Sequence, residues 1–199
     1  TIPVATDYWA CSKAAGHFVF GSKSFKIFNN TIQCQRFIFN SIDRKQVRES
    51  LGISQQAMVI GHTGRFTYQK NHEKIIKAFA ELYHHNKNTY LILVGEGKPV
   101  EDNIKVLVSR LGITKAVRFI GLQSKVAPFL SAMDVFLLPS HFEGFCISLL
   151  EAQANGLPCL ASSVIPNEVQ ITPSVTTCSL DESDIIWSNK LLQLYKQGR

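Results

Sequence analysis

The sequence predicts a doubly wound α/β domain, in which helices cover both faces of a parallel sheet. Apolar runs alternate with amphipathic segments from residue 58 onward, and the connections between them are short. The run at residues 90–94 is apolar throughout and ends at Gly95, as expected of a strand that is buried on both faces. Such alternation is typical of a Rossmann-like sheet, whose ligands bind at the carboxyl ends of the strands.

The first elements of this pattern follow from their periodicity. Residues 58–61 form a short apolar run, which indicates a buried strand. Residues 72–85 carry apolar side chains at helical spacing and predict an amphipathic helix, with Asn71 as its candidate N-cap. The run at residues 90–94 is the next strand.

The remaining elements alternate in the same way. Ile104, Leu107 and Leu111 form one helical stripe, which ends at Gly112. The later predicted elements are strands at residues 117–120, 135–138, 157–161 and 176–180, and helices at residues 126–133, 146–155 and 185–195.

Residues 1–57 lack this alternation of strand and helix patterns. Aromatic side chains crowd into residues 8–39, and only residues 43–51 indicate a short helix. We interpret residues 1–57 as the remnant of a preceding domain plus a linker, and residues 58–199 as the ligand-binding domain. The apolar side chains of the first part are expected to pack against a portion of the protein that is no longer in the chain.

The composition and charge of the chain limit the kinds of ligand or macromolecule that it is expected to bind. Hydrophobic residues make up 45% of the chain and charged residues only 18%, which argues against disorder. The formal net charge of +6 favours a phosphorylated ligand or a membrane surface. Nucleic acid is disfavoured, because no Lys/Arg run exceeds Arg44-Lys45 and no nucleic-acid-binding motif is present. No apolar run approaches the roughly 20 residues of a membrane-spanning helix.

The cysteines predict neither a disulfide framework nor a metal site. There are five of them, widely spaced and without a C-x-x-C pair. An odd number at such spacing is typical of reduced cytosolic thiols. The spacing of His and Cys also matches no zinc pattern, so we predict no bound metal.

Two loops at predicted strand ends carry candidate binding residues. Gly64, directly after the first strand, lets the backbone approach a ligand closely. Arg65 and Lys70 follow it, and both can bind phosphate oxygens, Arg65 through a planar fork and Lys70 as a point charge. Taken alone, the two cations can equally well be solvated side chains at a helix start.

The second loop precedes the helix predicted at residues 146–155. Free amides and the helix dipole at its start favour an anion, and Glu143 lies just before it. Glu151 lies two turns into the helix, and because helical side chains lean toward the N-terminus, it can point toward the same pocket. Glu143 can instead cap the helix, and Glu151 can be a surface residue beside a core stripe.

Together the two loops resemble a known family, the retaining GT-B glycosyltransferases of the group 1 type (family 4). The likeness is strongest to bacterial enzymes that assemble capsular polysaccharide or exopolysaccharide. The matching segments occur in family order and include Gly64-Arg65-Phe66, Lys70-Asn71, Val94-Gly95-Glu96-Gly97, Phe119-Ile120-Gly121-Leu122, Asp134-Val135-Phe136-Leu137-Leu138-Pro139-Ser140, the pair Glu143 and Glu151 with seven residues between them, and Gly156-Leu157-Pro158.

The resemblance implies a role for each candidate residue. Arg65 and Lys70 would bind the donor diphosphate and stabilise charge as the sugar departs. Glu143 would hold hydroxyls of the donor sugar, and Glu151 the ribose. The family implies three further groups of contacts: backbone amides of Gly144, Phe145 and Cys146 at the phosphate and sugar, and the loops at residues 95–97 and at Gly121 and Leu122 around the base.

The resemblance also sets the expected reaction. It implies transfer of a hexose or related sugar from a nucleoside diphosphate to a saccharide or lipid-linked acceptor with retention, in polysaccharide biosynthesis. A UDP-sugar is the expected donor, and GDP-sugars and ADP-sugars remain open. No cofactor or metal is implied. A cytoplasmic location is implied, with peripheral contact at the inner face of the membrane in the full-length enzyme.

Two departures from the family pattern stand out. Cys146 replaces the Pro of many members. We interpret the chain as lacking the acceptor-binding N-terminal domain of the family, and therefore expect it alone to bind donor but to be inactive.

Two other functions remain open from the sequence. A nucleotide-sugar epimerase has a similar architecture, but it needs acid and base residues around the sugar that we do not find. A non-catalytic binding module on the same fold has no reason to keep Arg65, Lys70, Glu143 and Glu151 together. Free epimerised nucleotide sugar among the products would indicate the first alternative, and a UDP-binding measurement bears on the second.

Overall fold

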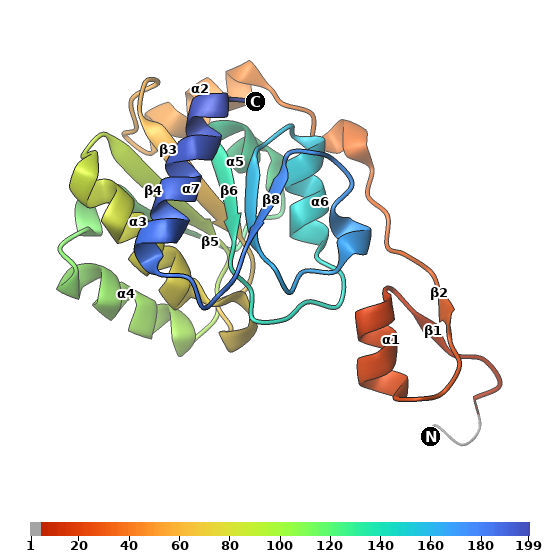
Figure 1. The fold of residues 1–199 in the computed structure, drawn as a ribbon. Coiled ribbons are helices and arrows are strands. Elements are labelled where there is room, and N and C mark those ends of the chain that lie inside the picture. The colour runs from red at the N-terminus through yellow and green to blue at the C-terminus, as the bar shows by residue number, and fades with distance from the viewer. Residues whose placement is uncertain (1–4) are drawn as a thin grey trace.

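The computed structural model describes residues 5–199, which are built around a six-stranded parallel sheet (Figure 1). The strand order is β5-β4-β3-β6-β7-β8, and every neighbouring pair is parallel. The predicted fold class is therefore confirmed. The strands are β3 (Met58–Thr63), β4 (Thr89–Val94), β5 (Val117–Gly121), β6 (Val135–Leu138), β7 (Cys159–Ser162) and β8 (Val175–Cys178).

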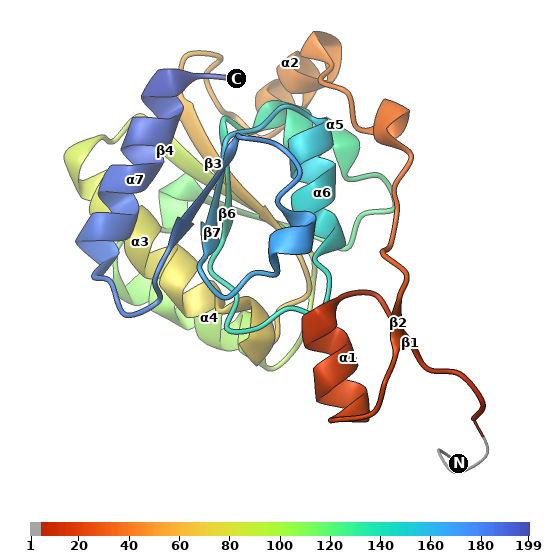
Figure 2. The same ribbon diagram turned by 45° about the vertical axis from the view of Figure 1, so that its right-hand side comes forward.

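Helices cover both faces of this sheet (Figures 1 and 2). Alternate residues of one strand enter opposite cores, since Ile60 packs in one apolar cluster and Val59 in the other. This division is why the strands read as continuous apolar runs. The helices on the Ile60 side are α3 (His72–His85), α4 (Val100–Arg110) and α7 (Asp184–Gln197), and those on the Val59 side are α2 (Ser41–Ser50), α5 (Ala127–Ala132) and α6 (Ile147–Ala154).

The helix predicted at residues 72–85 has the expected bounds and the expected cap. Asn71 adopts a left-handed conformation with φ 51°, and its side chain accepts a hydrogen bond from the Lys74 amide. Other bounds shift by a few residues. The fourth helix begins at Val100, ahead of its apolar stripe, because polar Glu101 and Asp102 occupy its first turn.

The first part of the chain holds structure that the sequence pattern did not reveal. A short parallel pair, β1 (Trp9–Ala10) and β2 (Lys26–Ile27), lies beside α1 (Lys13–Phe20), away from the sheet (Figure 1). The helix α1 escaped prediction because it buries no apolar stripe: Phe18 is 92% exposed. The helix predicted at residues 43–51 is α2. The division of the chain at residue 58 remains a prediction.

No helix within residues 5–199 combines the length and the apolar character needed to cross a bilayer.

Candidate functional site

The candidate site lies where the strand order reverses. From β3 the chain winds outward through β4 to β5, whereas from β6 it winds the other way through β7 to β8. The carboxyl ends of β3 and β6 are therefore neighbours whose following loops diverge, which leaves a crevice where ligands of doubly wound sheets bind. These two loops are residues 64–70 and 139–146, the two in which the main candidates lie.

The loop after β3 is fixed by backbone contacts with the next loop along the sheet. The Gly64 amide donates to the Val94 carbonyl, and the Phe66 amide donates to the Glu96 carbonyl. Gly95 has φ 138°, and a Cβ atom at this position would overlap the Gly64 carbonyl. Glycine is therefore required at residue 95 for the two loops to lie this close.

Lys70 and Glu143 form an ion pair at the centre of the crevice. Lys70 Nζ lies 2.7 Å from Glu143 Oε1, and the side chains are only 15% and 5% exposed. Lys70 Nζ also lies 3.7 Å from Cys146 Sγ. Burial alone would lower the pKa of Lys70, but Cys146 and Glu143 outweigh it and raise the pKa above its usual value. We therefore call Lys70 a held cation, because contacts with Glu143 and Cys146 fix its ammonium group in place.

Two further side chains hold the Glu143 carboxylate. Ser140 Oγ donates to Oε1 at 2.7 Å, and Gln69 Nε2 donates to Oε2 at 3.1 Å. Neither residue was singled out from the sequence. The available signal was their position, because Gln69 precedes Lys70 and Ser140 lies at the end of a predicted strand.

Arg65 lies in the same loop as Lys70 but in a different environment. It is exposed, and no other side chain or carbonyl in residues 5–199 pairs with its guanidinium. Its five donors are available to a ligand. The structure thus supplies one held cation and one free cation beside the crevice.

The start of α6 adds backbone donors to the site. Within the part of the chain that the structure describes, the amides of Gly144, Phe145 and Cys146 have no hydrogen-bond acceptor. Amides at a helix start attract anions. Cys146 is the N-cap residue and is buried, which raises the pKa of its thiol, so it is neutral at pH 7.

The segment before α1 contacts this loop directly. Ser12 Oγ donates to the Gly144 carbonyl, while the same oxygen caps α1 by accepting from the Ala15 amide. A cavity of about 430 Å³ lies between the two segments, next to the carboxylate. Its lining consists of Ala14, Ala15, Phe18, Val19, Gln69, Phe142, Glu143 and Gly144.

Glu151 lines a different cavity, of about 640 Å³. The other lining residues come from residues 36–43 and from the loop and helix start at residues 123–128. Burial raises the pKa of Glu151, and its carboxylate has no hydrogen-bond or ion-pair partner among the residues the structure describes. The two carboxylates therefore line separate cavities rather than one pocket, Glu143 from the loop before α6 and Glu151 from within α6.

The predicted base-binding loops are only partly in that cavity. Gly121 accepts a hydrogen bond from the Gly95 amide, so it ties the loops after β4 and β5 together. Leu122 is 68% exposed and does not line the cavity, whereas Gln123 beside it does. Gln123 was not predicted; its position one residue beyond Leu122 was the available signal.

Two buried histidines lie behind Lys70. The rings of His62 and His72 are 4.9 Å apart and nearly perpendicular. His62 Nδ1 contacts the Leu137 carbonyl at 2.8 Å, but His62 Nε2 and both ring nitrogens of His72 have no partner within residues 5–199. Burial, and then Lys70, lower the pKa of His72 to about 4. Burial, and then His72 and Lys70, also lower the pKa of His62 well below its usual value, so both rings are neutral at pH 7.

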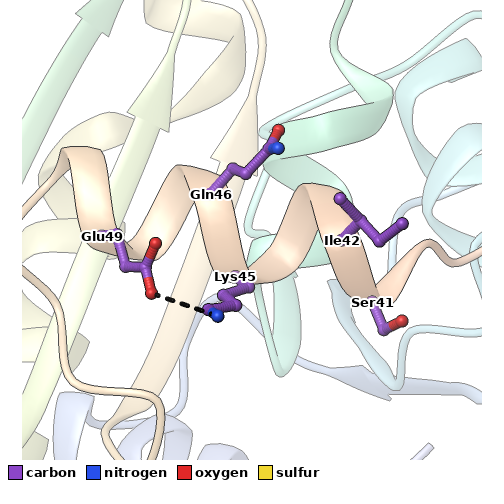
Figure 3. Close-up of a pocket in the computed structure, with 5 residues that line it drawn as sticks. All are labelled: Ser41, Ile42, Lys45, Gln46 and Glu49. Atoms are coloured by element: carbon purple, nitrogen blue, oxygen red, sulfur yellow. Dashed lines mark ion pairs between the residues drawn. The ribbon is translucent and has the colours of Figure 1, made fainter.

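A groove along α2 lies apart from this site (Figure 3). Its five lining residues, Ser41, Ile42, Lys45, Gln46 and Glu49, all come from one helix and are all exposed. The Lys45–Glu49 ion pair spans 4.0 Å in solvent, where such pairs contribute little. Arg48 attaches α2 to the amino end of β3, which is the end opposite the crevice. Its Nη1 atom donates to the carbonyl of Ala57, the residue before β3. This groove is a solvent-facing helix surface.

No group of three or more His, Cys, Asp or Glu side chains in residues 5–199 is arranged to hold a metal ion. The candidate binding groups are instead cations, carboxylates and backbone amides.

Comparisons with known proteins give this arrangement a family context. A family model described as glycosyl transferases group 1 matches residues 43–197. The chain is 31% identical, over 201 aligned residues, to the putative glycosyltransferase EpsF of Bacillus subtilis, covering 98% of this chain and 52% of that protein. It is 33% identical to the N-acetyl-alpha-D-glucosaminyl L-malate synthase of Bacillus anthracis, over 77% of this chain and 40% of that protein.

Solved structures share the fold. Anabaena Alr3699/HepE in complex with UDP-glucose superposes with a TM-score of 0.85 at 22% identity, over 97% of this chain and 55% of that one. WaaG, a glycosyltransferase involved in lipopolysaccharide biosynthesis, superposes with a TM-score of 0.81 at 23% identity, over 95% of this chain and 53% of that one. The chain spans about half the length of the curated relatives it matches.

Proposed function

Because this chain belongs to the group 1 family of glycosyl transferases, we propose that residues 58–199 bind a nucleoside-diphosphate sugar, specifically a UDP-sugar. The whole enzyme would transfer the sugar, with retention, to a saccharide or lipid-linked acceptor in polysaccharide biosynthesis. The proposal includes a cytoplasmic location, with peripheral contact at the inner face of the membrane when the acceptor is lipid-linked.

One observation carries the proposal: a held cation, a free cation and unpaired helix-start amides are on the two loops that follow β3 and β6, where the strand order reverses. Lys70 is fixed by Glu143, and Arg65 is exposed on the same loop as Lys70. A diphosphate carries the charge that such a set of donors complements. The fold is shared with Anabaena Alr3699/HepE, which was solved with UDP and with UDP-glucose, and this supports uridine as the base.

The two carboxylates are proposed to bind the two sugars of the donor. Glu143 lines the cavity of about 430 Å³ next to the cations, so it would contact hydroxyls of the transferred sugar. Glu151 is half-buried without a protein partner, and a carboxylate can accept two hydrogen bonds from a ribose diol. The larger cavity around Glu151 would hold the nucleoside.

Arg65 and Lys70 would supply the catalytic contribution of this domain. When the bond between the anomeric carbon and the diphosphate oxygen breaks, its electron pair remains on the diphosphate. The two cations would neutralise this developing charge in a partly water-excluded site, where such stabilisation is largest. The acceptor hydroxyl oxygen would then bond to the anomeric carbon on the same face of the sugar, and its proton would pass to the departing diphosphate oxygen.

Calorimetric titration of this chain with UDP, GDP, ADP and UDP-glucose tests the proposal. We expect UDP to bind, with GDP and ADP at least tenfold weaker. Absence of binding by all three nucleotides would contradict the proposal. For the full-length enzyme, release of free epimerised nucleotide sugar in place of a glycosylated acceptor would exclude transfer.

A further inference from the structure

Gln69 links the two loops of the crevice with three hydrogen bonds. Its side-chain Nε2 donates to Glu143 Oε2 and to the Phe142 carbonyl, both at 3.1 Å. Its own carbonyl accepts from the His141 amide at 2.8 Å. Both acceptors of the side chain are oxygens, so the nitrogen of the amide must face them, and the orientation of the amide group follows from its surroundings.

These bonds limit what the Glu143 carboxylate can still accept. A carboxylate has about four acceptor positions, two on each oxygen. Lys70 and Ser140 occupy both positions on Oε1, and Gln69 occupies one on Oε2. One position on Oε2 remains for a ligand.

Gln69 itself retains an acceptor beside that position. Its Oε1 atom has no donor among residues 5–199, and the residue lines the same cavity of about 430 Å³ as Glu143. Gln69 and Glu143 therefore border this cavity side by side, and its lining is mainly apolar. This combination suits a pyranose ring that presents hydroxyl groups to one wall.

We infer that Gln69 is a positioning and specificity-determining residue for the transferred sugar. It orients the Glu143 carboxylate, restricts it to one sugar hydroxyl, and supplies the acceptor for a second. The inference rests on the proposed function, because it assigns the cavity beside Glu143 to the sugar of the donor.

A purely structural role makes a different prediction. The bond from the His141 amide is made to the Gln69 backbone, so it survives any substitution of the side chain. If Gln69 only joins the loops, its substitution should affect UDP and UDP-sugars alike, because Lys70 lies on the same loop. If it orients Glu143, substitution should affect only the contribution of the sugar.

The variant Gln69→Met separates these roles, since it keeps the size of the side chain and removes its polar atoms. Gln46→Met is the matched control, because Gln46 is an exposed glutamine on α2 (Figure 3) that lines neither the cavity beside Glu143 nor the cavity beside Glu151. Calorimetry would measure Kd for UDP, UDP-glucose, UDP-galactose and UDP-N-acetylglucosamine. The quantity compared is the ratio of the Kd for UDP to the Kd for the tightest of these UDP-sugars.

We expect Gln69→Met to lower this ratio about tenfold, the loss typical of a hydrogen bond to a charged group. The Kd for UDP should change little, and Gln46→Met should match the wild type throughout. An unchanged ratio in Gln69→Met, or an equal loss for UDP and UDP-sugar, would overturn the inference while leaving the proposed function intact. Failure of the wild type to bind any of these ligands would overturn both.

Discussion

Lys70 and Glu143 face each other across the junction of β3 and β6, with Nζ 2.7 Å from Oε1 and both side chains largely buried. The pair joins the two loops that follow these strands. Each charge therefore depends on the other, because a buried charge without its partner is strongly destabilising. Stability and ligand binding are coupled at this point.

We expect Glu143→Ala to lower the free energy of unfolding by about 3 kcal/mol, because Lys70 would remain as an unpaired buried cation. Urea denaturation at pH 7 measures the loss. Glu73→Ala is the matched control, since it removes an exposed ion pair with Lys77 and should change stability by less than about 0.5 kcal/mol. Losses of equal, small size in the two variants would show that the Lys70–Glu143 pair is not effectively buried.

Arg65→Ala should weaken UDP binding about tenfold, the effect of losing a charge-assisted contact to phosphate. The Tm should stay unchanged, because Arg65 is exposed and has no partner in the described chain. Calorimetry with UDP measures the affinity, and Arg110→Ala, at an exposed arginine on α4, is the control. Equal Kd values for the two variants would remove Arg65 from the diphosphate site.

Glu151→Gln should weaken UDP binding but stabilise the free protein at pH 7. Burial raises the pKa of Glu151 in the folded state, so the ionised form opposes folding. The contribution of this carboxyl group to stability is present below its unfolded pKa and is lost as the pH rises through its folded pKa. Urea denaturation at pH 7 should therefore give a higher free energy of unfolding for Glu151→Gln, with no gain at pH 3. A loss of stability at pH 7 would contradict the assignment of an unpaired carboxylate.

His72→Phe should make the protein less sensitive to acid. The folded pKa of His72 is about 4, below the ordinary value of about 6.5, so the unfolded chain binds the extra proton first. Stability should fall as the pH decreases from 6.5 to 4. Between pH 7 and pH 5 this one group accounts for about 2 kcal/mol. A phenyl ring keeps the stack with Phe66, whose ring centroid lies 4.0 Å away.

The comparison that tests this is the drop in unfolding free energy from pH 7 to pH 5, which should be smaller in His72→Phe than in the wild type. His84→Phe, at an exposed histidine near the end of α3, should retain the full drop. If the two variants lose stability equally, His72 is not the titrating group.

The fold could be predicted from the sequence because the apolar periodicity of each segment matches the side chains that the segment buries in the structure. The continuous apolar run of β4 arises because its alternate residues enter the cores on the two faces of the sheet, and the apolar stripe of α3 arises because this helix packs against one face. The helix α1 could not be found in this way, since Phe18 and Val19 on it are exposed and no apolar stripe marks its buried face.

The loops that carry the site, and the types of residue in them, could be predicted from the sequence. The contacts between these residues could not. Arg65 and Lys70 were expected to act as a pair on one ligand. The pairing of Lys70 with Glu143 depends instead on β3 lying next to β6, and strand order is not encoded in the pattern of any single segment. Gln69 and Ser140 escaped notice for the same reason, since they become partners of Glu143 only when the two loops meet.

A crystal structure of this chain with UDP tests the central claim most directly. We predict diphosphate oxygens about 3 Å from Lys70 Nζ and from the Arg65 guanidinium, at the junction of β3 and β6. The ribose hydroxyls should contact Glu151. A nucleotide bound elsewhere, with Lys70 still paired only to Glu143 and Arg65 still in solvent, would contradict the account.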